Sequence, residues 1–164
     1  KSVTLFVREP FLTVVTIADG IQTMSFAIIR ILHLLAALVL GMAILVTNMG
    51  FSRELSRDDR QSLKKMLLLQ GFAAAAAALA GAILWLAVGR PAAFYQGTPF
   101  FHAKLLLFLL VILLPVPAAL HLGRHANRTA GKTPGHVLLA LRLQLVILIC
   151  IPALAWLIAR GIGH

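Results

Sequence analysis

Four basic side chains in the apolar parts of this sequence could take part in chemistry inside a membrane. Arg30 and His33 lie in the first long apolar segment, and His102 and Lys104 lie at the start of the third. Ionisable groups are costly in hydrocarbon, so those that are kept there usually have a function. None of the four long apolar segments contains Asp or Glu. This basic set therefore suggests an anionic partner and argues against a proton relay built on carboxylates.

Three kinds of anionic or electron-rich partner would suit these residues: a lipid phosphate, a quinone oxygen or the propionates of a porphyrin. A neutral imidazole is also a common protein ligand of haem iron. We therefore expect His33 to bind haem b as an axial ligand of the metal. Arg30, Lys104 or Arg160 would then meet the propionates. His102 completes the set of candidate cofactor-binding residues.

Each of these residues also has a purely structural interpretation. His33 could hydrogen-bond to a neighbouring helix. His102 is close enough to the membrane boundary to be solvated, and Lys104 could extend its ammonium outward to water. Arg30 and Arg160 could anchor the helices to lipid headgroups. The sequence leaves both interpretations open.

The composition indicates the class of protein in which these residues act. Of the 164 residues, 60% are hydrophobic and only 12% are charged, whereas soluble domains are about a quarter charged. This excess of hydrophobic over charged residues indicates an integral membrane protein. The formal net charge of +10 comes mostly from residues between the apolar segments, which predicts contacts with lipid headgroups and no binding of nucleic acid. The sequence has one cysteine, which excludes an intrachain disulfide, and no HExxH, Walker or GxGxxG motif.

Four apolar segments are each long enough to cross a bilayer as a helix, for which about 20 residues are needed. Their approximate ranges are 21–46, 66–88, 99–120 and 137–158. Because the links between them are short, we predict an all-α, up-down bundle of four transmembrane helices. Pro115, Pro117 and Pro152 are expected to kink the third and fourth helices. Arg142 and Gln144 are expected at the interface where the fourth helix begins.

The distribution of Lys and Arg predicts how the bundle is oriented. The first and third links carry eight of these residues: Arg53, Arg57, Arg60, Lys64, Lys65, Arg124, Arg128 and Lys132. The opposite side carries four: Lys1, Arg8, Arg90 and Arg160. We therefore expect a multi-pass protein of the bacterial inner (cytoplasmic) membrane with both termini in the periplasm. This orientation places the four basic residues named at the outset in the outer half of the bundle.

The prediction divides the chain into an N-terminal segment, residues 1–20, and a transmembrane domain, residues 21–164. The first segment is apolar but contains Pro10, Asp19 and Gly20. We expect it to be too short and too interrupted to span the membrane, and to lie as an interfacial helix on the outer face. A docking arm for another subunit is the alternative.

Three stretches resemble a family of four-helix bacterial inner-membrane proteins known as a domain of unknown function, DUF2214. They are ILHLLAALVLG (31–41), AFYQGTPFFHAKLLLFLL (93–110) and LRLQLVILICIPALAWLIARGIG (141–163). That family is in turn similar to the HemJ-type protoporphyrinogen oxidases and to the membrane domain of CopD copper-resistance proteins. HemJ-type proteins carry a His in the first helix and a His-Ala-Lys-Leu-like stretch at the start of the third, which match His33 and residues 102–105. The resemblance implies haem ligation by His33 and a catalytic role for Lys104.

Two functions of different classes agree with these patterns. The first is a haem-binding redox protein that oxidises a porphyrinogen or passes electrons to a quinone. The alternative is a non-catalytic accessory subunit of a larger membrane complex, and export of a small solute is a third, weaker hypothesis. The expected partners are the lipid bilayer and, depending on the function, a porphyrin, a quinone, a larger complex or a second copy of the chain. Whether the protein is an enzyme stays open at this stage.

Overall fold

A computed structural model describes residues 8–52, 54–88, 97, 99–124 and 131–160, with most side chains described from Thr23 onward. Within these ranges, four helical stretches are long and apolar enough to cross a membrane: Thr23–Gly50, Arg57–Ala87, Pro99–Arg124 and Gly135–Ile158. Only 17–22% of the apolar core of each stretch is buried. Many large apolar side chains of these stretches are exposed, as lipid contact requires. The predicted all-α membrane bundle is confirmed.

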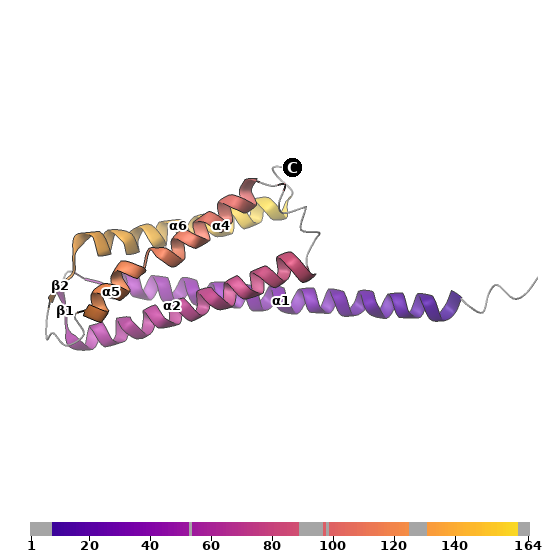
Figure 1. Cartoon of the computed structure of the whole chain (residues 1–164), viewed down its shortest axis with the longest axis horizontal. Coiled ribbons are helices and arrows are strands. Elements are labelled where there is room, and N and C mark those ends of the chain that lie inside the picture. The colour runs from indigo at the N-terminus through magenta and orange to yellow at the C-terminus, as the bar shows by residue number, and fades with distance from the viewer. Residues whose placement is uncertain (1–7, 53, 89–96, 98, 125–130, 161–164) are drawn as a thin grey trace, which may run out of the picture.

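The helices form two layers (Figure 1). One layer holds α1 (Arg8–Gly50) and α2 (Arg57–Ile83), and the other holds α4 (Pro99–Leu113) and α6 (Gly135–Ala159). α5 (Val116–Arg124) crosses from α4 toward the start of α2. The main partners are α1 with α2 and α4 with α6, while contacts of α1 with α6 and of α5 with α2 join the layers. Successive spans run in opposite directions (Figure 1), so the connectivity is up-down as predicted.

The first helix is longer than the sequence suggested. α1 has 43 residues and is therefore about 65 Å long at 1.5 Å per residue. It continues through Asp19 and Gly20, where an interruption was expected, and extends beyond the other helices in Figure 1. Residues 1–7 lie outside the described part of the chain. The division at residue 20 and the interfacial position of the N-terminal segment stay predictions.

The second span starts earlier than expected. α2 begins at Arg57, nine residues before the predicted start at Met66 (66 − 57 = 9). A capping box fixes this start: the Ser56 hydroxyl accepts a hydrogen bond from the Asp59 N–H at 3.2 Å, and the Asp59 carboxylate accepts one from the Ser56 N–H, also at 3.2 Å. These bonds satisfy backbone donors that a helix start leaves unpaired. The Ser-x-x-Asp spacing in the charged link is the sequence signal for it.

The third span breaks between α4 and α5, at the proline where a kink was predicted. Pro115 has no N–H, so the carbonyl of Val111 lacks the donor that a regular helix would supply four residues later. The side chain of Gln144 on α6 replaces that donor, with its Nε2 atom 2.8 Å from the Val111 oxygen. Gln144 is fully buried, so its expected place at the interface is wrong. α6 itself continues through Pro152 as one helix.

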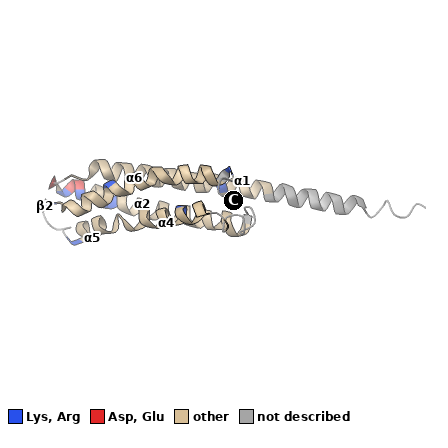
Figure 2. Ribbon diagram, turned by 90° about the horizontal axis from the view of Figure 1, so that it is seen from above, with Lys and Arg blue, Asp and Glu red and all other residues tan. Residues whose placement is uncertain are grey.

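The first and third links meet at one end of the bundle, which we call the link end. There, β1 (Glu54–Leu55) pairs antiparallel with β2 (Gly131–Lys132), and charged residues gather around the pair (Figure 2). Two apolar clusters form the core above it. The link-end cluster contains Phe51, Leu55, Leu63, Ala118, Leu122, Val137 and Leu141. The mid-bundle cluster contains Leu40, Ile44, Ala73, Ala74 and Val111.

Candidate functional site

His33 bonds to the neighbouring helix and leaves one ring nitrogen available. Its Nδ1 atom is 2.9 Å from the backbone oxygen of Ala77 on α2, and the ring is half-buried. A carbonyl only accepts, so Nδ1 carries the proton and donates it, and Nε2 keeps its lone pair. Within the described part of the chain, Nε2 has no hydrogen-bond partner. Metal-binding histidines are commonly held in this way, through a hydrogen bond from the nitrogen that does not bind the metal.

Gly81 makes room for the imidazole of His33. A Cβ atom at position 81 would lie 3.1 Å from His33 Cε1 and 3.4 Å from its Nδ1. Any larger residue there would push against the ring. Gly81 lies four residues after Ala77, so one turn of α2 supplies both the acceptor and the space. The sequence indicated only that this helix has a surface of small residues.

Lys104 on α4 shares this part of the bundle with His33. Its side chain is partly buried, and its ammonium is close enough to act electrostatically on His33. Among the described residues, Lys104 has no hydrogen-bond or ion-pair partner. The structure therefore brings together two of the residues that the sequence singled out, one from each layer.

An aromatic pair closes the gap between α4 and the end of α2, and sequence reasoning missed it. The rings of Trp85 and Phe101 lie 5.1 Å apart at an interplanar angle of 60°. Phe101 precedes Lys104 by one turn. Trp85 lies in the π-helix η1 (Leu84–Val88), a distortion often found at functional sites. The indole Nε1 atom of Trp85 is buried and has no hydrogen-bond partner among the described residues. It is a further N–H donor available to a bound acceptor.

The remaining candidates lie on the outside of the bundle. Arg30 and His102 are exposed, and His102 touches the edge of Phe101 with 5.9 Å between ring centroids. The guanidinium of Arg160 stacks 4.2 Å above the ring of Trp156. These positions suit contacts with headgroups or with the edge of a bound molecule. Their roles in cofactor binding stay predictions.

No multi-residue metal centre is present in the described ranges, since they hold no group of three or more His, Cys, Asp or Glu that could bind a metal ion. Haem differs from such a centre because its porphyrin supplies four nitrogens and the protein adds only axial ligands. His33 can supply one of them through Nε2. The residues present therefore fit one axial ligand of a haem.

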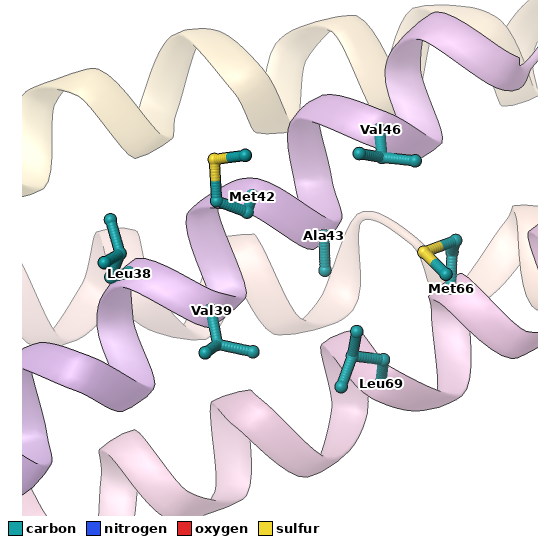
Figure 3. A pocket seen from close by; sticks show the side chains of 7 residues that line it. All are labelled: Leu38, Val39, Met42, Ala43, Val46, Met66 and Leu69. Carbon is teal, nitrogen blue, oxygen red and sulfur yellow. The ribbon is translucent and has the colours of Figure 1, made fainter.

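An apolar groove on the outer side of α1 and α2 is a poor candidate for a specific site. Its cavity volume is about 250 Å³, and its lining consists of Leu38, Val39, Met42, Ala43, Val46, Met66 and Leu69 (Figure 3). Specific ligand sites need a few placed polar groups to orient the ligand. This lining offers only hydrocarbon and thioether groups, which suit a lipid chain.

Comparison with known proteins places the chain in a family. The model of a family described as predicted membrane protein (DUF2214) matches residues 25–163. The chain belongs to the DUF2214 family. The matched region of this DUF2214 protein includes His33, Gly81, Trp85 and Lys104. No curated protein and no solved structure matches the chain.

Membership of DUF2214 confirms one part of the resemblance seen in the sequence. The description supports a membrane protein and names no activity. The further similarity of this DUF2214 chain to HemJ-type and CopD proteins stays a prediction. The geometry around His33 and Lys104 must therefore carry any functional argument.

Proposed function

We propose that this chain is a haem-binding redox protein of the bacterial inner membrane. The observation that supports the proposal is the 2.9 Å contact of His33 Nδ1 with the Ala77 carbonyl, because it fixes the tautomer and leaves the lone pair of Nε2 available to a metal. A haem would supply reversible one-electron chemistry, suited to oxidising a porphyrinogen or to passing electrons to a quinone. In this proposal, Lys104 binds an anionic group of the cofactor or substrate, with Arg30 and His102 at its outer edge.

The direct test is the absorption spectrum of the purified wild-type protein, oxidised and then reduced with dithionite. We expect a Soret band that shifts on reduction, either as purified or after haem is supplied. Protein that stays colourless after haem is supplied would contradict the proposal. An assay of porphyrinogen oxidation and of quinone reduction would then separate the two redox roles.

Replacing Lys104 by Met tests the proposed contact with an anionic group. The wild type should bind haem more tightly than haem dimethyl ester, which lacks the propionate charges. A hydrogen bond to a charged group contributes about 1.5–3 kcal/mol, so the preference should be about tenfold or more. Lys104→Met should remove this preference in a titration monitored at the Soret band. Lys64→Met, at an exposed position of the link end, is the matched control. An unchanged preference in Lys104→Met would show that Lys104 does not contact the propionates.

We propose that both termini lie in the periplasm and that the link end is cytoplasmic. Ser52 is exposed in the first link and suits a reporter cysteine. In a Cys150→Ala background, Ser52→Cys should react with a membrane-impermeant maleimide only after the membrane is opened. Labelling of Ser52→Cys in intact spheroplasts would show that the link end is periplasmic and would contradict the proposed orientation.

The accessory-subunit hypothesis also has one observation in its favour. α1 is longer than a bilayer requires and extends past the other helices (Figure 1), which gives a second protein a helix to pack against. An accessory subunit should be colourless and should co-purify stoichiometrically with a larger complex, even as His33→Ala. The haem protein should instead be coloured and should purify without a larger complex.

A further inference from the structure

The bundle contains a layer of buried polar side chains between its two apolar clusters. We call it the polar belt: Thr47 and Asn48 on α1, Gln70 on α2 and Gln144 on α6, all at most 6% exposed. Along α1 and α2, the belt falls between a residue of the link-end cluster and a residue of the mid-bundle cluster. Along α6, it falls between Leu141 of the link-end cluster and Leu148, which packs against the mid-bundle cluster. The break between α4 and α5 occupies the same place in the third span.

The contacts of α1 with α2 show at which level along the bundle axis Gln70 lies, which we call its depth. His33 faces Ala77 near one end of this contact, and Gly50 faces Leu63 at the other. Gln70 is seven residues from each α2 partner (77 − 70 = 7; 70 − 63 = 7). It is therefore level with the midpoint of the α1 stretch from 33 to 50, near residue 41.

The contact of α1 with α6 places Gln144 close to that depth. A Cβ atom on Gly41 would lie 3.7 Å from Leu148 Cδ2, so Leu148 is level with Gly41 and hence with Gln70. Gln144 is four residues from Leu148, about one helical turn or roughly 6 Å along the axis. The two glutamines thus enter the interior of the bundle from opposite layers within one turn of each other.

Several polar atoms of the belt have no hydrogen-bond partner among the described residues. Both amide atoms of Gln70 are buried without a hydrogen bond to any described residue, and so are Gln144 Oε1 and Asn48 Oδ1. The other amide atoms of Gln144 and Asn48 are satisfied, by the carbonyls of Val111 and Ile44. A buried polar group that lacks a partner is destabilising, and more so where lipid surrounds the helices. These atoms therefore point to a ligand in the interior.

We propose that the polar belt binds water between Gln70 and Gln144, the two belt side chains that lie within one turn of each other. Their two unpartnered acceptor oxygens and one amide donor group match water, which donates two hydrogen bonds and accepts two. The amides are neutral and the belt contains no ionisable group, so a neutral ligand fits better than an ion. Buried waters typically make about three hydrogen bonds to such groups. This site is independent of the proposed haem site and lies in the half of the bundle nearer the link end.

The first test is the thermal stability of Gln70→Met in detergent or nanodiscs. Met has nearly the same length as Gln but cannot bind water. If water bridges the two glutamines, the variant leaves the water and Gln144 without a hydrogen-bond partner. The Tm of the variant should then fall by about 2–4 °C or more. Gln61→Met, an exposed position on the same helix, is the matched control and should leave the Tm nearly unchanged. A higher Tm in Gln70→Met would show that the amide has no partner and would overturn the proposal.

The second test detects the water in the unmodified protein. Solid-state NMR of protein labelled with 15N at Gln, in bilayers, should show magnetisation transfer from water to the side-chain amide of Gln70 despite its burial. The signal is assigned by its loss in Gln70→Met. Absence of this transfer would overturn the proposal even if Gln70→Met lowers the Tm, because the two amides would then bond directly to each other.

Discussion

Protein with His33→Ala is expected to lose the Soret band of the wild type completely, both as purified and after haem is supplied. The reason is that His33 is the described residue whose geometry suits an axial ligand. Its Nδ1 atom is fixed by the Ala77 carbonyl, and its Nε2 atom is available. Removal of an axial ligand leaves only non-directional contacts to hold the cofactor. Spectra of the oxidised and reduced protein measure the effect.

His102→Ala is the matched control for this experiment. It removes an imidazole from the first turns of α4, where the side chain is exposed and touches Phe101. This variant should keep the Soret band and its shift on reduction. A band that survives in His33→Ala but disappears in His102→Ala would move the ligand from α1 to α4 and would refute the assignment of His33.

Gly81→Leu is expected to displace the His33 ring and to destabilise the bundle even without haem. A Cβ atom at this position already approaches His33 Cε1 to 3.1 Å, and the rest of a leucine side chain needs more space. Overpacking of this kind costs about 1–3 kcal/mol. The hydrogen bond from His33 to Ala77 should also break, because Gly81 and Ala77 lie on adjacent turns of α2 and both face the His33 ring. We expect a lower Tm and weaker haem binding than in the wild type.

Gly71→Leu provides the control on the same helix. Nothing in the described structure lies within 4 Å of a Cβ atom at Gly71, and the position is exposed. Both substitutions remove a glycine from the helix interior and gain the same helix propensity. Their difference in Tm therefore reports the contact with His33. Equal stability of the two variants would show that the ring does not occupy the place described here.

Hydropathy was sufficient to predict the four spans, because helix formation in lipid depends on local properties. A segment of about 20 apolar residues must form a helix to satisfy its own backbone, and this requirement needs no knowledge of the neighbours. The break at Pro115 was also predictable, since a missing N–H is a property of one residue. The start of α2 at Arg57 was missed although its Ser-x-x-Asp signal is local, because the charged link hid the helix from a search based on hydropathy.

The contacts between helices were decided only by tertiary structure. Nothing in the sequence distinguishes Ala77 as the partner of His33, because six consecutive alanines, 73–78, offer equivalent backbone carbonyls. The buried position of Gln144 was likewise unpredictable. It depends on the register that brings α6 beside the unpaired carbonyl of Val111, and the near-terminal place of Gln144 in its helix suggested the interface instead.

The candidate site shows the same division between local and long-range information. The sequence alone determined that His33 and Lys104 are ionisable groups within apolar segments and in the same half of an up-down bundle. The tertiary structure added Gly81 and the pairing of Trp85 with Phe101, which depend on the rotation and register of each helix. Those two quantities are set by the summed packing of many weak side-chain contacts, and no single stretch of the sequence contains them.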